Sequence, residues 1–141
     1  MLHFLLAEDD DDHAELVLRS LRRSGQGHTM DRVPNGVEAL TYLRRQGPYA
    51  NAPRPGVILL DLNMPRLGGH EVLRQMKEDE SLRCIPVVIL TTSEAESDLA
   101  RAYQHYANSY LVKPADFIQF SKMIEQIGHY WGQLNRPVEG A

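Results

Sequence analysis

Strand-like and helix-like patterns alternate five times along this chain, and no other feature of the sequence restricts the fold as much. The strand-like segments are short apolar or β-branched runs at residues 3–8, 29–33, 57–62, 86–91 and 109–112. Each is followed by a stretch with apolar residues at steps of three and four, the spacing of an amphipathic helix. Such an alternation is typical of an open parallel sheet with helices on both faces. We therefore predict an α/β fold with a doubly wound, five-stranded parallel sheet.

The helical patterns also carry signals for where helices begin and end. The first helix is expected after Asp11 or Asp12 and ends at Gly25, while the last follows Asp116. Asn35 with Glu38, and Ser93 with Glu96, have the spacing of capping boxes. The apolar residues at helical spacing are Ala14, Val17, Leu18, Leu21; Ala39, Leu40, Leu43; Val72, Leu73, Met76; Leu99, Tyr103, Tyr106; and Phe117, Phe120, Ile124, Ile127, Trp131, Leu134. In each predicted helix these positions form one apolar face.

Length and composition indicate one globular domain. The 141 residues are 43% hydrophobic and 24% charged, and we assign residues 1–134 to the domain and 135–141 to a short tail. A net charge of −4 without a basic stripe argues against a nucleic-acid binder. No apolar run reaches 18 residues, so no membrane span is expected. The single cysteine, Cys84, is expected to be buried and fits a cytoplasmic protein.

Polar residues follow four of the five predicted strands. Glu8-Asp9 ends the first, Asp61 the third, Thr91-Thr92 the fourth, and Lys113 follows the fifth. Because the carboxyl ends of parallel strands meet at one edge of the sheet, where such folds bind ligands, these side chains are predicted to lie together.

Three neighbouring carboxylates repel one another, since two unit charges about 4 Å apart cost roughly 4 kcal/mol at an effective dielectric near 20. A divalent cation among the acids, with Lys113 nearby, removes that cost. Mg²⁺ suits such a site because it prefers oxygen ligands and binds through one or two carboxylates. The same groups would hold a phosphoryl group, and Asp61 could attack it to form an acyl phosphate.

Simpler interpretations exist for each residue alone. Asp10, Asp11 and Asp12 are more simply a solvated helix start in a favourable dipole. Asp61 alone could be a turn carboxylate that accepts nearby amides, and Lys113 alone indicates nothing. The joint occurrence of acids, threonine and lysine at four strand ends favours a built site.

The chain resembles the receiver domain of two-component response regulators over residues 3–134. The residues that carry the resemblance are Glu8-Asp9, the stretch from Asp61 to Gly69 (DLNMPRLGG), Thr91, and Tyr110-Leu-Val-Lys113-Pro114. It implies a flavodoxin-like sheet of strand order 2-1-3-4-5. One departure is Gly68-Gly69, where many members carry Asp-Gly.

The resemblance also implies roles for single residues. Asp61 would be the phosphorylation site, with Mg²⁺ bound by Asp9, by Asp61, by the backbone carbonyl of Asn63, and by Glu8 largely through water. Thr91 would be the switch hydroxyl and Lys113 the ion-pair partner of the phosphoryl group. Tyr110 would report phosphorylation to the surface of the fourth helix, fifth strand and fifth helix. The Lys113–Pro114 bond would be cis.

A narrower resemblance concerns the partner. The loop GPYANAPRPG (47–56), the stretch LTTSEAE and the aromatic HYW look like those of stand-alone receivers that partner bacterial and cyanobacterial phytochrome kinases. The implied phosphodonor is then a light-regulated histidine kinase. Without an output domain the signal would leave through a surface, and Trp131 and Leu134 either cap the core or form a homodimer seam that Tyr103, Tyr106 or Tyr130 could join.

Three alternatives use the same residues. A haloacid-dehalogenase-type phosphatase also needs an aspartyl nucleophile, but its general acid two residues later is replaced here by Asn63. A flavodoxin would need a hydroxyl- and glycine-rich loop after the first strand, where EDDDD would repel the flavin phosphate. A phosphorylation-independent scaffold is disfavoured by the complete set of acids, Thr91 and Lys113.

Overall fold

The computed structural model describes residues 2–137 and shows the predicted alternation of strands and helices. The strands are β1 (His3–Ala7), β2 (Thr29–Val33), β3 (Val57–Leu60), β4 (Val87–Thr91) and β5 (Ser109–Val112). The helices are α1 (Asp11–Arg23), α2 (Gly36–Leu43), α3 (Gly69–Glu78), α4 (Glu96–Gln104) and α5 (Phe117–His129), with a 3-10 turn at Gly47–Tyr49 and a π-helical turn at Tyr130–Leu134. The last element ends at Leu134. The domain boundary there remains a prediction, and residues 138–141 of the predicted tail lie outside the described part.

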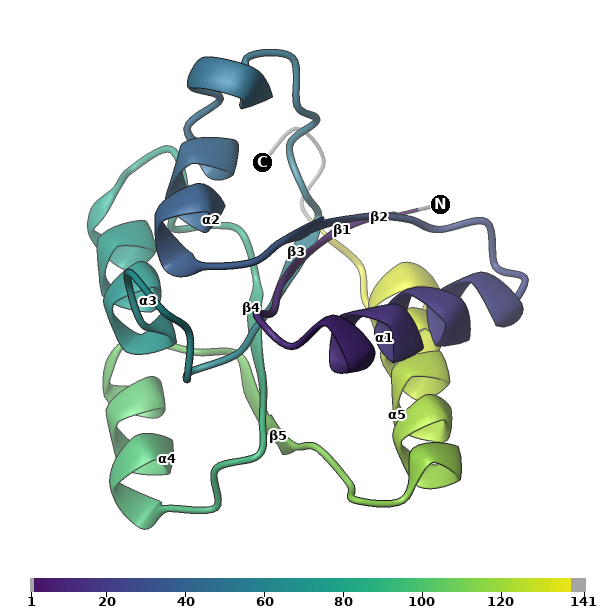
Figure 1. Cartoon of the computed structure of the whole chain (residues 1–141). Coiled ribbons are helices and arrows are strands. Elements are labelled where there is room, and N and C mark those ends of the chain that lie inside the picture. The colour runs from purple at the N-terminus through teal and green to yellow at the C-terminus, as the bar shows by residue number, and fades with distance from the viewer. Residues whose placement is uncertain (1, 138–141) are drawn as a thin grey trace.

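All five strands are parallel and lie in the order β2-β1-β3-β4-β5, which confirms the predicted fold class. Figure 1 shows α2, α3 and α4 on one face of the sheet and α1 and α5 on the other. From β1 the chain first adds β2 on one side and then returns to add β3, β4 and β5 on the other, so the direction of strand addition reverses between β1 and β3. Ligands of doubly wound folds bind outside the carboxyl ends of the strands at such a switch point.

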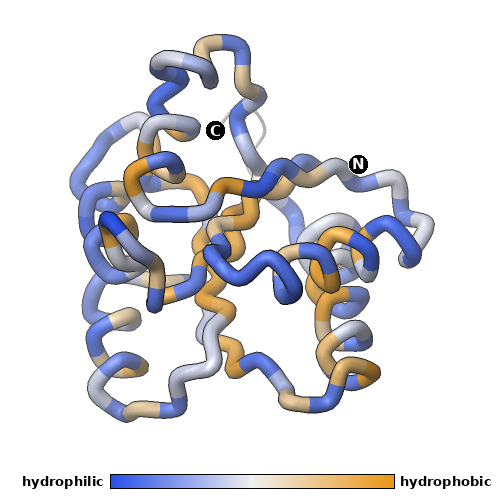
Figure 2. Tube along the Cα trace, viewed as in Figure 1, coloured by the Kyte–Doolittle hydropathy of each residue, from blue (hydrophilic) through white to orange (hydrophobic). Residues whose placement is uncertain are grey.

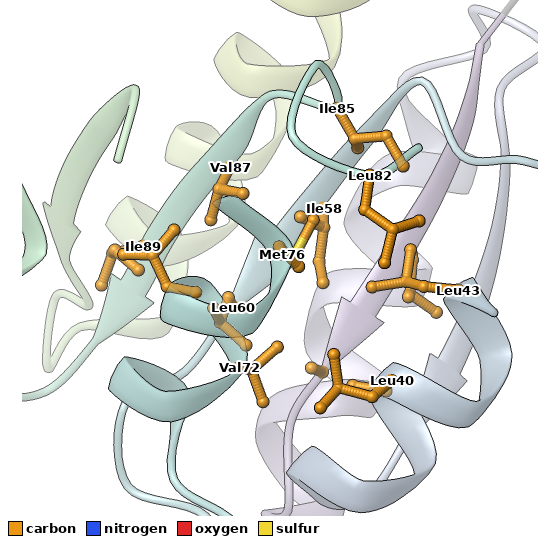
Figure 3. Close-up of a cluster of buried hydrophobic side chains, with 14 of the residues drawn as sticks. Leu40, Leu43, Ile58, Leu60, Val72, Met76, Leu82, Ile85, Val87 and Ile89 are labelled. Atoms are coloured by element: carbon orange, nitrogen blue, oxygen red, sulfur yellow. The ribbon is translucent and has the colours of Figure 1, made fainter. Parts of the chain in front are cut away.

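Alternate residues of the central strands form two separate cores. Ile58 and Leu60 of β3 contact the core under α2 and α3, whereas Val57 and Leu59 contact the core under α1 and α5. This explains why β3 is a continuous apolar run, since both of its faces are covered. Apolar residues follow the strands in Figure 2, and Figure 3 shows Ile58 and Leu60 packed with Val72, Met76 and others on the α2–α3 side.

Helix starts agree with the sequence signals for α2 and α5 and differ for α1 and α4. Helix α1 begins at Asp11 rather than after Asp11 or Asp12, because the side chain of Asp10 accepts the amides of Asp12 and His13. The side chain of Asn35 accepts the amide of Glu38, and that of Asp116 accepts the amides of Ile118 and Gln119. Ser93 was expected to cap α4, and this prediction is wrong. The helix begins at Glu96 after Ala95, because the hydroxyl of Ser93 donates to the side chain of Asp98 instead.

One further expectation about burial is wrong. Cys84 is exposed, because Ile85 takes the buried position that leads into β4. Tyr103 and Tyr106, which could belong either to the core or to a surface seam, lie on the surface. They are 49% and 75% exposed, and Tyr106 lies past the end of α4 with a φ of 64°. Only Ala102 of α4 is buried, so this helix covers the sheet much less closely than its sequence pattern indicates.

The apolar stripe of the last helix is buried only in its middle. Phe120, Ile124 and Ile127 lie in the core, whereas Phe117 and Leu134 at its two ends are 68% and 62% exposed. The π-helical turn after His129 changes the helical spacing, so the stripe does not continue along one face. Trp131 is half-buried against the α1–α5 core.

Candidate functional site

The carboxyl edge of the sheet gathers a buried polar cluster. Glu8 follows β1, Asp61 follows β3 and Lys113 follows β5, and their exposed fractions are 1%, 6% and 7%. Charged residues are seldom buried without partners. Their grouping at this edge is therefore a specific feature of the fold, as the sequence predicts.

The ammonium of Lys113 lies at the centre of this cluster. Its Nζ donates to Oε1 of Glu8 (2.5 Å), to Oδ2 of Asp61 (3.0 Å) and to Nδ1 of His13 (3.0 Å). An ammonium has three N–H donors, so these three acceptors satisfy it completely. Lys113 is thereby fixed between the two buried carboxylates.

The positive charge of Lys113 offsets part of the negative charge of the two buried carboxylates. Burial raises the pKa of the Glu8 carboxyl, and the hydrogen bond from Lys113 opposes the rise. Asp61 also raises the Glu8 pKa, because two neighbouring carboxylates disfavour each other's charge. Removal of either partner from a buried ion pair leaves an uncompensated charge, so the three residues depend on one another.

A divalent cation fits the acidic side of the cluster. Carboxylate oxygens of Glu8, Asp9 and Asp61 lie within 4.8 Å of one another, and Asp9 is exposed to solvent. This combination offers two buried carboxylate ligands and one that is accessible to solvent, which suits Mg²⁺. The backbone amide of Asn63 donates to Oδ1 of Asp61 at 3.3 Å, and a ligand role for its carbonyl stays a prediction.

Close backbone packing fixes the position of Asp61. Its amide donates to the carbonyl of Ala7 (3.0 Å), and the amide of Gly69 donates to that of Leu62 (2.9 Å). A Cβ on Gly69 would lie 2.2 Å from the carbonyl oxygen of Asp61, so only glycine allows α3 to begin here. The start of α3 is therefore tied directly to the end of β3.

The remaining predicted residues lie beside this cluster on β4 and β5. Thr91 is fully buried and Thr92 is exposed, and the carbonyl of Thr91 accepts the amide of Lys113 (2.7 Å). The hydroxyl of Tyr110 donates to the carbonyl of Ser93 (3.0 Å), which joins β5 to the loop before α4. The amide of Ser93 donates to the hydroxyl of Thr91 (3.4 Å), so Thr91 and Tyr110 both contact Ser93.

The predicted cis bond before Pro114 is absent. No cis peptide bond occurs among residues 2–137. Lys113 nevertheless points inward, because its backbone amide bonds Thr91 and its ammonium bonds the two acids.

Two histidines also lie at this edge of the sheet, and each bonds a residue far from it in the sequence. His13 lies in the first turn of α1, and its Nδ1 accepts from Lys113. His70 is the second residue of α3 and donates from Nε2 to Asp98 of α4 (3.0 Å). The cap at Asp10 could have placed His13 at the edge, since it accepts the His13 amide, but no pattern indicates the contact between His70 and Asp98.

Comparison with known proteins agrees with this geometry. The sequence profile of the response regulator receiver domain matches residues 4–125. A curated relative from Methanothrix harundinacea, "Probable methanogenesis regulatory protein FilR2", is 45% identical over 94% of this chain and 84% of its own length. Response regulator Rcp1 of Synechocystis sp. is 40% identical over 90% of this chain and 86% of its own.

Solved structures agree equally well. The Mn²⁺-bound form of Rcp1 superposes with a TM-score of 0.92 at 37% identity, covering 98% of this chain and 99% of the other. The phosphorylated cyanobacterial phytochrome response regulator RcpA superposes with a TM-score of 0.93 at 38% identity, covering 96% and 97%.

The chain therefore belongs to the response regulator receiver family, a class of signalling domains in two-component phosphorelays rather than of conventional enzymes. Within that family it is similar to Rcp1 and to phytochrome response regulators. No helix among residues 2–137 is long and apolar enough to cross a membrane.

Proposed function

We propose that the protein accepts a phosphoryl group from a histidine kinase onto Asp61 and changes the surface formed by α4, β5 and α5 in response. The observation that carries this proposal is the buried contact of one ammonium, Lys113, with both Glu8 and Asp61 beside an accessible Asp9. A merely structural ion pair does not need a third, exposed carboxylate held close to it.

Each residue of the cluster has a definite part in this proposal. Asp9, Asp61 and the carbonyl of Asn63 would hold Mg²⁺ directly and Glu8 largely through water, and the ion would supply positive charge to the phosphoryl oxygens. Lys113 turns from Asp61 toward a phosphoryl oxygen, and the hydroxyl of Thr91 donates a hydrogen bond to another phosphoryl oxygen. Tyr110 moves together with Thr91, because its hydroxyl donates to the carbonyl of Ser93 in the loop that follows Thr91.

The reacting groups in the proposed transfer are the carboxylate of Asp61, a phosphodonor and solvent. A carboxylate oxygen of Asp61 attacks phosphorus and forms a P–O bond, while the P–N bond of the kinase's phosphohistidine breaks and its imidazole takes a proton from solvent. With acetyl phosphate the broken bond is P–O and acetate leaves. Positioning and charge stabilisation supply most of the acceleration in such transfers. Slow hydrolysis of the acyl phosphate would then reset Asp61.

The direct test is phosphorylation by acetyl phosphate, followed by intact mass. We expect one phosphoryl adduct that requires Mg²⁺, is lost with a chelator, and is absent from Asp61→Asn. Asp10→Asn is the matched control, because Asp10 is an exposed helix cap outside the cluster and should leave the adduct unchanged. An adduct that persists in Asp61→Asn, or no adduct at all, would contradict the assignment.

The alternatives are not favoured by the family membership. For a haloacid-dehalogenase-type phosphatase, the general acid is missing because position 63 is an exposed asparagine. Fast release of inorganic phosphate from acetyl phosphate would nonetheless support that reading. A phosphorylation-independent scaffold would give no adduct while binding its partner normally.

We assign the phosphodonor to a phytochrome-type histidine kinase. The support is similarity to Rcp1 and to the phytochrome response regulator RcpA, whereas the name of FilR2 indicates a different regulatory setting. Transfer from radiolabelled autophosphorylated kinases tests this directly. Faster transfer from a phytochrome kinase than from an unrelated histidine kinase is expected, and equal rates would contradict it.

A cytoplasmic location and a homodimer belong to the same proposal. Histidine kinases phosphorylate themselves with ATP, so their receivers are expected in the cytoplasm. Tyr130 and Leu134 at the end of the chain's last helical segment are 49% and 62% exposed, and they offer an apolar surface for a second copy. Light scattering of the protein and of Leu134→Asp tests the dimer, and a monomer in both samples would exclude it.

A further inference from the structure

A polar network outside the acidic cluster joins α3, α4 and the loop between β4 and α4. The carboxylate of Asp98 accepts at each of its oxygens: from Nε2 of His70 at Oδ1 (3.0 Å) and from the hydroxyl of Ser93 at Oδ2 (2.6 Å). These two bonds lower the pKa of Asp98. Ser93 in turn accepts the Tyr110 hydroxyl at its carbonyl. One side chain of α4 is thus bonded to two other elements at once.

The network is not a hydrolytic triad. In a triad the histidine bonds the serine hydroxyl on one side and the carboxylate on the other. Here both His70 and Ser93 bond the carboxylate, and the Nδ1 of His70 is buried without a hydrogen-bond partner among the described residues. Nε2 is therefore the ring nitrogen of His70 through which the side chain contributes to the network.

The anchor of the network is fixed to the phosphoacceptor strand. His70 is 8% exposed and directly follows Gly69, whose backbone packs against the carbonyl of Asp61. The backbone that carries His70 is therefore held next to the end of β3.

The other end of the network is loosely attached. Ala102 is the one buried residue of α4, and the N-terminus of this helix has no side-chain cap. The hydrogen bonds of Asp98 therefore supply much of what fixes the first turn of α4, since burial supplies little.

We propose that His70 and Asp98 form a latch that fixes the first turn of α4 and the loop at Ser93 to the end of β3. When the loop after Thr91 moves, the bonds of Ser93 and of the latch transmit the movement to Tyr110 and α4. His70 and Asp98 are thus positioning residues for the response, which rests on the proposed phosphorylation of Asp61, but they do not touch the transferred group.

The variants separate the bond from the fold. His70→Leu removes the donor but keeps an apolar side chain in a buried position, and His70→Gln restores a nitrogen donor near that of Nε2. Asp98→Ala removes both acceptors. Glu96→Ala is the matched control, because Glu96 is an exposed acid in the same turn of α4. Circular dichroism confirms that each variant is folded.

The measurement is hydrogen–deuterium exchange of peptides covering residues 96–104, with and without acetyl phosphate and Mg²⁺. Without phosphorylation, we expect exchange in α4 to be about tenfold faster in His70→Leu, the effect of losing one hydrogen bond to a charged group. Exchange should be faster still in Asp98→Ala, because this variant loses the bonds from both His70 and Ser93. His70→Gln and Glu96→Ala should stay close to the unmodified protein. The double variant should be no faster than Asp98→Ala, because the two residues share one interaction.

In the phosphorylated samples, the adduct should form to the same extent in His70→Leu as in the unmodified protein, while the change in α4 exchange on phosphorylation should be lost. Unaltered α4 exchange in His70→Leu, an effect of Glu96→Ala as large as that of Asp98→Ala, or an undiminished response would overturn the latch. Absence of the adduct in every sample would instead refute the proposed function, and the unphosphorylated samples would still decide whether the latch holds α4.

Discussion

The helices α4 and α5 flank β5 on opposite faces of the sheet, yet they are attached in different ways (Figure 1). Helix α5 buries Phe120, Ile124 and Ile127 and is capped by Asp116. Helix α4 buries only Ala102, lacks a side-chain cap, and is tied by Asp98 to His70 and Ser93. Apolar burial has no direction, whereas hydrogen bonds depend on geometry. A helix fixed mainly by hydrogen bonds is therefore better suited to change position when a neighbouring loop moves.

The difference in how α4 and α5 are attached is tested most directly by truncating one apolar side chain in each helix. Ile124→Ala in α5 should lower the free energy of unfolding by about 3 kcal/mol, because it opens a cavity in the core. Leu99→Ala in α4 should cost less than about 1 kcal/mol, because Leu99 is only half-buried. Urea denaturation followed by circular dichroism measures both. Equal losses would show that α4 is attached as firmly as α5.

The next largest effect is expected where α3 meets the end of β3. Gly69→Ala places a Cβ 2.2 Å from the carbonyl of Asp61, so it should cost about 2 kcal/mol, as overpacked sites do, and slow phosphorylation. Gly68→Ala is its neighbouring control, since its nearest contact would be 3.4 Å. The measurements are urea unfolding and the rate of adduct formation. If the two alanines behave alike, close packing does not position Asp61.

The helix caps sharpen the comparison further. Asp116→Ala should destabilise the protein by about 1 kcal/mol, because it leaves the amides of Ile118 and Gln119 without their acceptor. Ala95→Ser should instead slow hydrogen exchange in α4, because Ala95 has the extended backbone of a cap but no side-chain acceptor. Unfolding midpoints and α4 exchange rates test the pair. No change in α4 exchange would mean that its N-terminus is already fixed by other contacts.

The smallest expected effect is a pH dependence at the far end of α5. The ring of His28 bonds the carbonyl of Gly128 and the amide of Leu2, and its burial lowers the pKa from its ordinary value of 6.5. The folded protein then binds fewer protons than the unfolded chain, so this contribution is full above pH 6.5 and decreases below it.

Urea midpoints between pH 7.5 and 5.5 measure this contribution. The decrease should be smaller in His28→Gln than in His129→Gln, which changes an exposed histidine at the end of the same helix. An identical pH dependence in the two variants would remove His28 as its source.

Much of the fold could be predicted because its determinants are local. The apolar runs, the caps at Asn35 and Asp116, and the acids after β1 and β3 are each visible in a few neighbouring residues. Their meeting at one edge follows from the parallel topology. For that reason Glu8, Asp61 and Lys113 could be grouped before any coordinates.

What could not be predicted depends on contacts between distant segments. Nothing near Ser93 in the sequence shows that its hydroxyl bonds Asp98 rather than capping α4, and the spacing of Tyr103 and Tyr106 matches a buried stripe although both are exposed. His13 and His70 likewise acquire their partners only when the chain is folded.

The central claim is that Asp61, among several clustered acids, carries the phosphoryl group. Borohydride reduces an acyl phosphate to the alcohol, so treatment of the phosphorylated protein followed by peptide mass spectrometry marks the acceptor as homoserine. We expect homoserine at position 61 only, and only in samples that contained Mg²⁺. Homoserine at Asp9 or any other acid, or none in a sample that carries the adduct, would contradict the account.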